Sequence, residues 1–570
     1  MNGSRPSANN LSLIYASPGP PGGASHWKGN NVQQKAKSGI FGYGIPAAFA
    51  FAFPIGLVIA SLIALWSVAS DSLSDGSPLT ALIDLASERY IRRAIFFTLL
   101  QATLSALLST LLAIPLARAL ASRDFPGRGA ILSLFGAPFI LPVIVAILGL
   151  IAIWGRNGLM AKASAAISLP ELPFYGLFGI LLAHVFFNLP LATRILLQGW
   201  LTIPSEHWRL AAQLGMKHAQ VARHIEWPML RERLPGIFAL VFLLCATSFT
   251  VVLALGGGPK ATTIELAIYQ AIRFEFDLER AAILACIQIL LCAGLALLFR
   301  TITKDHDTGQ SLGGLINRQD RTSPLLRLLD GMVIALALAF LASPLLAAFG
   351  RGALSLMVHG VDLDAILMAS LRSVSVSLGA CTIMLLISLP LAQMSLHLKG
   401  KGRRIGELPG FAILVAPPIA LGAGLFVMLH QHISVDDLAL PLTSLLNGLQ
   451  AVPFALIILS PAMARVERDY GRQILHLGMD RRAAIRLVHW PLMRRPLGLS
   501  LGIAAALSMG DLGVIALFGS PSEPTLPLYL YQQMGAYRMD QAYGSGLLLT
   551  LFAFAVFLLF DKGLGGRDRD

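Results

Sequence analysis

The sequence predicts an all-α polytopic membrane protein with about twelve transmembrane helices, arranged as two homologous six-helix halves. Its 570 residues are 55% hydrophobic and only 13% charged, whereas soluble globular domains carry about 25% charged residues. Apolar runs of about 20 residues, the length that crosses the hydrocarbon core of a bilayer, recur along the chain. The chain also contains two copies of one polar loop pattern. These three observations together predict the fold class.

The candidate spans form two groups of six. The first group precedes residue 301 and covers about 43–67, 95–121, 129–154, 174–199, 235–256 and 281–300. The second group follows residue 327 and covers about 328–350, 369–396, 405–430, 438–463, 497–519 and 542–561. We therefore expect one half at 43–300 and the other at 328–562.

Three polar stretches lie outside these halves. Residues 1–42 are rich in Gly, Pro, Ser and Asn and contain no acid, which predicts a disordered cytoplasmic tail. Residues 301–327 carry charges of both signs and are predicted to form a cytoplasmic linker between the halves. Residues 563–570 are expected to form a short cytoplasmic tail at the C-terminus.

Basic residues indicate the orientation, because lysine and arginine favour the cytoplasmic ends of membrane helices. With the N-terminus inside, the loop that holds Arg118 and Arg123 faces the cytoplasm, and so do both copies of the repeated loop. Twelve spans then place both termini on the cytoplasmic side of the membrane. These loops explain the net charge of +13, so we expect a lipid bilayer and no nucleic acid as a partner. The four cysteines lie in apolar runs, and neither a disulfide framework nor a metal site is expected.

The repeated pattern covers 20 residues in each half. The first loop, Arg209–Pro228, reads RLAAQLGMKHAQVARHIEWP, and the second loop, Arg472–Pro491, reads RQILHLGMDRRAAIRLVHWP. The two copies lie 263 residues apart, and Pro190 matches Pro453 at the same spacing. Further upstream, IPLA at 114–117 corresponds to LPLA at 389–392, at a spacing of 275. The two halves are therefore predicted to be parallel copies of one unit.

Each loop is predicted to form a helix, a turn and a second short helix. Gly215 and Gly478 can adopt the positive φ that closes the first helix. The Trp-Pro pair is expected to end the second helix, because a residue before proline is pushed out of the α region. Two basic loops with the same spacing suggest two equivalent docking sites on the cytoplasmic side. The alternative is an interfacial helix that only anchors the next span, with Trp227 and Trp490 among the lipid headgroups.

The two loops resemble the EAA loop of the permeases of ABC importers, in which a glycine and a later proline occur at these spacings. The resemblance implies that each loop is a coupling helix that docks on one of two copies of a separate ATP-hydrolysing subunit. In this family an acid opens the loop, whereas here that position holds Arg209 and Arg472, so the opening contact is expected to differ. The coupling residues implied by the resemblance are Arg209, Ala211, Gly215, Met216, Trp227 and Pro228, and Arg472, Gly478, Met479, Trp490 and Pro491.

Longer segments are similar to the thiamine/thiamine pyrophosphate ABC transporter permeases. They are YGLFGILLAHVFFNLPLATRILLQ at 175–198, LALGGGPKATTIELAIYQA at 253–271, GDLGVIALFG at 510–519 and LPLYLYQQMGAYR at 526–538. This resemblance covers about residues 43–560. It implies the fold of a type I ABC importer permease, fused from two halves, and a periplasmic binding protein that delivers thiamine or its phosphate esters.

Asp511 is the most informative ionisable residue predicted to lie inside a span. Acids at that depth are costly and usually face a polar cavity, and thiamine is a cation, so Asp511 is a candidate for the translocation pathway. Ser248 occupies the equivalent position of the first half. The alternative for Asp511 is an interhelical hydrogen bond or a place near the end of the span. The prolines at 142, 417 and 418 interrupt the third and ninth predicted spans.

Other functions remain open at this point. No G-x-x-x-x-G-K-[ST] phosphate loop occurs, so the chain is expected neither to hydrolyse ATP nor to act as an enzyme, and no cofactor is expected. A fused ABC permease for ferric iron, a polyamine or a phosphonate would carry the same loops. An ion-coupled secondary transporter could also have twelve spans and an internal repeat. It would not need the duplicated loops, and it would normally carry several ionisable residues inside its spans.

Overall fold

A computed structural model describes residues 44–71, 88–136, 141–168, 170, 173–258, 261–302, 323–358, 360, 362–398, 406, 408–430, 432–433 and 435–565. All regular secondary structure within these ranges is helical, which confirms the predicted class. The predicted N-terminal tail lies outside the described residues, as do 303–322 of the predicted linker and 566–570 of the predicted C-terminal tail.

The first half contains four unbroken long helices and two broken ones. The unbroken helices are α2 (Ile45–Asp71), α4 (Arg89–Ser122), α9 (Leu177–Leu201) and α15 (Leu278–Ile302). The third predicted span comprises α5 (Arg128–Leu134) and α7 (Val143–Trp154), and the fifth comprises α12 (Trp227–Ala246) and α13 (Phe249–Leu255). Shorter helices connect them: α8 (Leu159–Ala166), α10 (Ser205–Gln213), α11 (His218–Val221) and α14 (Ile264–Gln270).

The second half repeats this order. Its unbroken helices are α16 (Pro324–Val358), α17 (Leu363–His397), α21 (Val435–His476) and α26 (Met539–Gly565). Its broken spans are α19 (Leu408–Val415) with α20 (Pro418–Leu429), and α23 (Trp490–Met509) with α24 (Gly513–Phe518). The short helices α22 (Arg481–Ala484) and α25 (Leu526–Gly535) complete it.

The number of spans differs slightly from the predicted twelve. Within the described ranges, ten helices are long and apolar enough to cross a membrane, or eleven if the bent pair α12 and α13 is counted as one span. The remaining predicted span, 405–430, consists of α19 and α20, which have 8 and 12 residues. Neither piece alone reaches the length of about 20 residues that crosses the hydrocarbon core.

Proline and glycine explain where the broken spans break. Pro142 precedes α7 with ψ 130°, and Pro417 precedes α20 with ψ 141°. The two prolines lie 275 residues apart, and each lacks the N–H that a continuous helix needs. The fifth span bends by 57° between α12 and α13, at Thr247 and Ser248. Its counterpart breaks at the equivalent Gly510, between α23 and α24.

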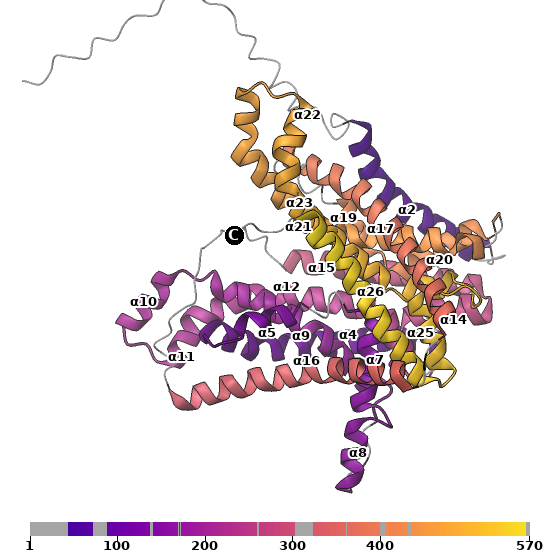
Figure 1. The fold of residues 1–570 in the computed structure, drawn as a ribbon, viewed down its shortest axis with the longest axis horizontal. Coiled ribbons are helices and arrows are strands. Elements are labelled where there is room, and N and C mark those ends of the chain that lie inside the picture. The colour runs from indigo at the N-terminus through magenta and orange to yellow at the C-terminus, as the bar shows by residue number, and fades with distance from the viewer. Residues whose placement is uncertain are drawn as a thin grey trace, which may run out of the picture.

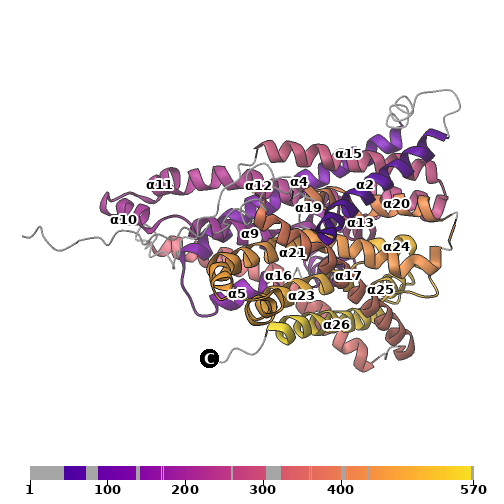
Figure 2. The same cartoon turned by 90° about the horizontal axis from the view of Figure 1, so that it is seen from above.

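The two halves interleave, because the first span of each packs against the other half. Helix α2 packs on α20 and α17, and α16 packs on α7 and α4. Two glycines 275 residues apart allow these crossings. A Cβ atom at Gly149 would overlap the backbone of Pro344 in α16, and one at Gly424 would lie 2.6 Å from the Cβ of Ser61 in α2. In Figure 1, α9, α12 and α16 run across the picture, and α21, α23 and α26 run obliquely from its top toward its lower right; Figure 2 shows the same bundle from above.

Candidate functional site

The first and second loops lie toward the same end of the bundle. In Figure 1, α10 and α11 of the first loop lie at the far left, and α22 of the second loop lies at the top. The helices α14 and α25 lie at the opposite end. This arrangement agrees with the predicted parallel repeat, because both copies of the loop face the same way.

The turn at the centre of each loop has the same geometry. Gly215 has φ 60° and Gly478 has φ 59°. In the first loop the N–H of Met216 donates to the carbonyl of Ala211 at 3.0 Å, and in the second the N–H of Met479 donates to Ile474 at 3.1 Å. These bonds close a helix with a left-handed residue, as predicted. No atom outside the turn lies within 4 Å of a Cβ built on either glycine, so only the positive φ requires glycine.

The prediction that Trp-Pro ends the second helix is wrong in both loops. Residues Ala222–Glu226 and Ile485–His489 form π-helical turns that continue into α12 and α23. Trp227 keeps helical angles, with φ −61° and ψ −42°, and its N–H donates to the carbonyl of Ala222. The wider turn places each proline in the first turn of the following α-helix, where an N–H has no helical partner. Trp227 thus occupies the α region despite the proline that follows it, and that proline needs no helical N–H because it lies at the start of α12.

The surfaces of the two loops combine apolar and basic side chains. Trp227 and Trp490 are 54% and 51% exposed. Leu214 and Leu477, which directly precede the turn glycines, are 68% and 74% exposed. The remaining predicted loop residues divide by burial: Arg209, Gly215, Pro228, Arg472, Gly478 and Pro491 are exposed, Met216 and Met479 are half-buried, and Ala211 is buried. Each loop thus presents a similar apolar and positively charged surface.

The helices that carry the two loops differ. In the first half, helix α9 ends at Leu201, and Pro204 precedes α10 with ψ 139°. The equivalent residue of the second half is Glu467, which lies inside the unbroken 42-residue helix α21. A proline lacks the N–H that would continue α9 into α10. The first loop is therefore attached through α9 and α10, which are separated at Pro204 and which we call the broken arm. The second loop is attached through α21, which we call the continuous arm.

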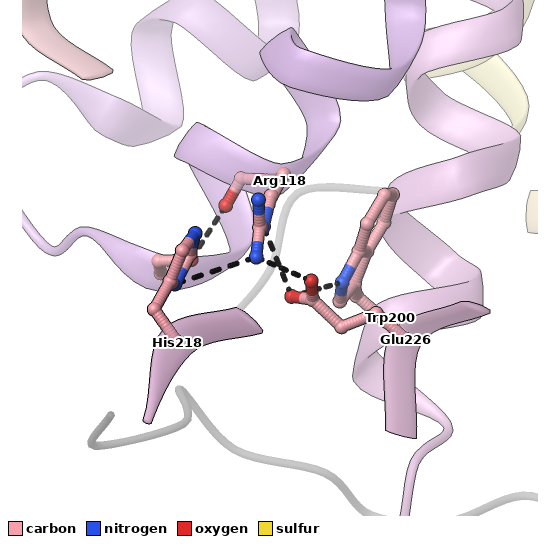
Figure 3. A network of polar contacts seen from close by, with 5 residues as sticks. Arg118, Trp200, His218 and Glu226 are labelled. Atoms are coloured by element: carbon pink, nitrogen blue, oxygen red, sulfur yellow. Dashed lines mark hydrogen bonds and ion pairs between the residues drawn. The ribbon is translucent and has the colours of Figure 1, made fainter. Parts of the chain in front are cut away.

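Buried polar contacts hold the first loop against α4 and α9. Arg118 Nη2 lies 2.6 Å from Glu226 Oε2, and Arg118 Nε donates to Glu226 Oε1 at 3.1 Å. The indole N–H of Trp200 donates to the same Oε1 at 3.2 Å, and His218 Nδ1 lies 3.5 Å from Arg118 Nη2. Figure 3 shows that the four side chains converge from α4, α9 and the loop. The side chain of Glu226 is only 2% exposed.

A cavity lies where the broken spans of both halves meet. It has a volume of about 300 Å³. Its wall includes Pro142, Thr247, Pro417 and Gly510, one residue from each of the four breaks. The polar side chains that line it are Thr247, Thr250, Asn447, Gln450, Ser508 and Asp511. Because the lining comes from both halves, the cavity lies at the interface between them.

Asp511 and Ser248 lie at equivalent breaks, but only Asp511 lines the cavity. The two carboxylate oxygens of Asp511 accept hydrogen bonds from the backbone N–H groups of Gly513 and Val514, at 3.1 and 3.2 Å. They therefore cap the first turn of α24. Ser248 is half-buried at the start of α13 and makes no capping bond. Its neighbours Thr247 and Thr250 line the cavity instead.

Sequence reasoning missed two parts of this site. The acid of the loop was overlooked because most charges around Glu226 are positive, although its replacement by His489 in the second copy marks it as unusual. Asn447 and Gln450, one helical turn apart on α21, were also missed. Gln450 stands out only in three dimensions, because its Nε2 is buried without a hydrogen-bond partner.

Comparison with known proteins identifies the family. The thiamine transport system permease protein ThiP of Brucella abortus is 41% identical over 491 residues, which cover 84% of this chain and 89% of that protein. ThiP of Escherichia coli is 39% identical over 534 residues, covering 92% and 97%. ThiP of Haemophilus influenzae is 36% identical over 487 residues, covering 82% and 89%. No family model matches the chain. Together with the duplicated loops and spans, this identity over most of the chain shows that the chain belongs to the thiamine transport system permease family.

Proposed function

We propose that this chain is the permease subunit of an ATP-driven importer that moves thiamine and its phosphate esters across the bacterial inner membrane. The observation that carries the proposal is the pair of loops with matching glycine turns, toward one end of a duplicated bundle. The thiamine permeases that match most of its length support the substrate. Both termini are assigned to the cytoplasmic side, with the loops.

Two copies of a separate ATPase subunit dock on the first and second loops in this proposal. The exposed leucine and tryptophan of each loop, Leu214 with Trp227 and Leu477 with Trp490, offer the apolar contacts, and the surrounding arginines offer charge. The chain itself carries out no hydrolysis. A periplasmic binding protein delivers the substrate to the opposite end of the bundle.

The cavity between the halves is the proposed passage for the substrate. Thiamine carries a fixed positive charge on its thiazolium ring, and Asp511 supplies a carboxylate to the cavity wall. Although two backbone N–H groups bond to this carboxylate, each of its oxygens retains a further lone pair for a cation or a water. Asn447 and Gln450 add amide groups beside it.

The alternatives are less well supported. Permeases for ferric iron, polyamines or phosphonates would share the loops, but the relatives that match at 36–41% identity are thiamine permeases. An ion-coupled secondary transporter does not explain two loops with the same left-handed turn and the same π-helical continuation.

Uptake of radiolabelled thiamine in a strain that lacks its own thiamine permease tests the substrate. The chain, expressed with its ATPase and binding protein, should restore uptake, and Asp511→Asn should lower it about tenfold at limiting thiamine, the effect of losing one charged interaction. Membrane abundance should not change. Restored uptake of another solute without thiamine uptake would reject the assignment.

Co-purification of the ATPase tests the docking sites. Valine at Gly215 or Gly478 forces a β-branched residue into a positive φ, so the double variant Gly215→Val with Gly478→Val should lose the ATPase. Gly294→Val is the matched control, because Gly294 lies in α15 with open space around a Cβ atom. Retention of the ATPase by the double variant would show that it docks elsewhere.

A further inference from the structure

We propose that Arg118, Trp200 and Glu226 form a latch that fixes the first loop to α4, and that the second loop works without an equivalent latch. The latch is a positioning device: it transmits movement of the docked ATPase to the membrane helices. This inference rests on the proposed function, because it assumes that the loops receive the ATPase. It adds an asymmetry between two loops whose turns are the same.

The geometry of the latch resists separation. Arg118 faces Glu226 with two nitrogens, Nε and Nη2, so the pair is bidentate and directional. Trp200 adds a third donor from α9. If the loop moved away from α4, Arg118 and Glu226 would lose their two-point contact, and separating a largely buried ion pair is unfavourable. The first loop and the end of α4 are therefore expected to move together.

The broken arm explains why the first loop requires such a contact. Pro204 interrupts the helical hydrogen bonding between α9 and α10, so α9 alone cannot hold the loop rigidly. Trp200 lies four residues before this break and Glu226 lies at the far end of the loop. Their hydrogen bond closes the segment between them into a fixed unit. Helix α21 supports the second loop without a break.

The equivalent positions of the second half carry residues that cannot form the latch. Gln393 replaces Arg118, Met463 replaces Trp200 and His489 replaces Glu226. Within the described part of the chain, the side chains of Gln393 and His489 make no hydrogen bond or ion pair, and Gln393 is exposed. No pair of opposite charges can arise from this set.

The end of α4 also contacts the second half of the chain through an ion pair. Arg123, which directly follows α4 in extended conformation, is 2.8 Å from Asp330 of α16, and the Asp330 side chain is only 7% exposed. Helix α16 is the first span of the second half. Movement of the first loop therefore has a path into the half that carries Asp511, through two partly buried ion pairs at the end of α4.

The test compares matched glutamine variants in the complete transporter, reconstituted in proteoliposomes with the ATPase and thiamine-loaded binding protein. The readout is thiamine accumulated per ATP hydrolysed. Glu226→Gln should lower this ratio at least about fivefold, the lower end of typical coupling energies. The control His489→Gln should leave it unchanged. The double variant Arg118→Gln with Glu226→Gln removes both charges, so it should recover thermal stability but not the ratio.

Three results would overturn the latch: an unchanged ratio in Glu226→Gln, equal losses in Glu226→Gln and His489→Gln, or a normal ratio in the double variant. The last would mean that the ion pair only supports folding. In all three the ATPase still co-purifies with the unmodified chain. If it failed to co-purify even there, the proposed function would fall together with the latch.

Discussion

The two loops have the same turn and differ in what holds them. Both close a helix on a glycine with φ near 60° and continue through a π-helical turn into the next span. The first loop follows helices that are separated at Pro204, and the Glu226 ion pair holds it in place. The second loop extends from the unbroken α21. Duplication has therefore kept the surface offered to a partner and changed its support.

The largest effect is expected from breaking the continuous arm. Glu467→Pro places a proline at the position equivalent to Pro204, inside α21. An interior helical proline costs about 3 kcal/mol, and no latch is available to compensate. Thiamine uptake should fall to background, whereas the control Glu467→Ala should transport normally. Normal uptake by the proline variant would show that continuity of α21 is not what supports the second loop.

The ion pair should be the next most sensitive feature. Removing Glu226 alone leaves Arg118 facing a buried site, at a cost of up to about 3–5 kcal/mol for a buried pair; the 21% exposure of the arginine lowers this to roughly 2–3 kcal/mol. A double-mutant cycle of Arg118→Gln and Glu226→Gln, followed by denaturant unfolding in detergent, measures the coupling energy. A coupling energy near zero would contradict the geometry.

A smaller effect should follow from replacing the proline that interrupts the broken arm. Pro204→Ala restores the missing N–H between α9 and α10 and makes the first arm more like α21. In the Glu226→Gln background this change should recover part of the lost thiamine-to-ATP ratio, roughly two- to threefold. The same change in the unmodified chain should have little effect. Failure to recover any coupling would separate the proline from the latch.

The smallest effect tests what the loops share. Alanine at Gly215 or Gly478 must adopt a positive φ, which costs about 1–2 kcal/mol. Because no atom crowds either position, the two substitutions should weaken ATPase binding equally, in a titration of the reconstituted chain with purified ATPase. Unequal losses would mean that the two turns, and not only their supports, have diverged.

Composition and local pattern predicted most of the fold. The apolar runs predicted helix in each of the twelve segments, although the third candidate span is Val143–Ala166 and only partly overlaps the predicted 129–154. Gly215 and Gly478 indicated the turns because a positive φ is a local demand of the chain. The π-helical continuation was not predicted, because the restriction on a residue before proline is only a preference, and a proline in the first turn of a helix needs no N–H partner. Within the described residues, 405–430 is the one predicted span that no long helix covers, because Pro417 separates the shorter α19 and α20.

The site was less predictable because it depends on contacts between distant residues. Asp511 could be selected as an acid in an apolar run, but its two hydrogen bonds to the start of α24 depend on where the span breaks. Arg118 and Glu226 lie 108 residues apart. Their pairing follows from the packing of α4 against α12, which apolar periodicity does not specify.

The unbroken α21 also acts as a lever. It passes the cavity at Asn447 and Gln450 and continues for 26 further residues to His476, a length of about 39 Å at 1.5 Å per residue. A rotation of about 10° around the cavity would thus displace its far end by roughly 7 Å. In the proposed importer, closure of the ATPase through a few ångströms at the second loop would correspond to a change of only a few degrees beside the cavity. A displacement of several ångströms at the second loop would thereby become a displacement beside the cavity on the scale of a small molecule.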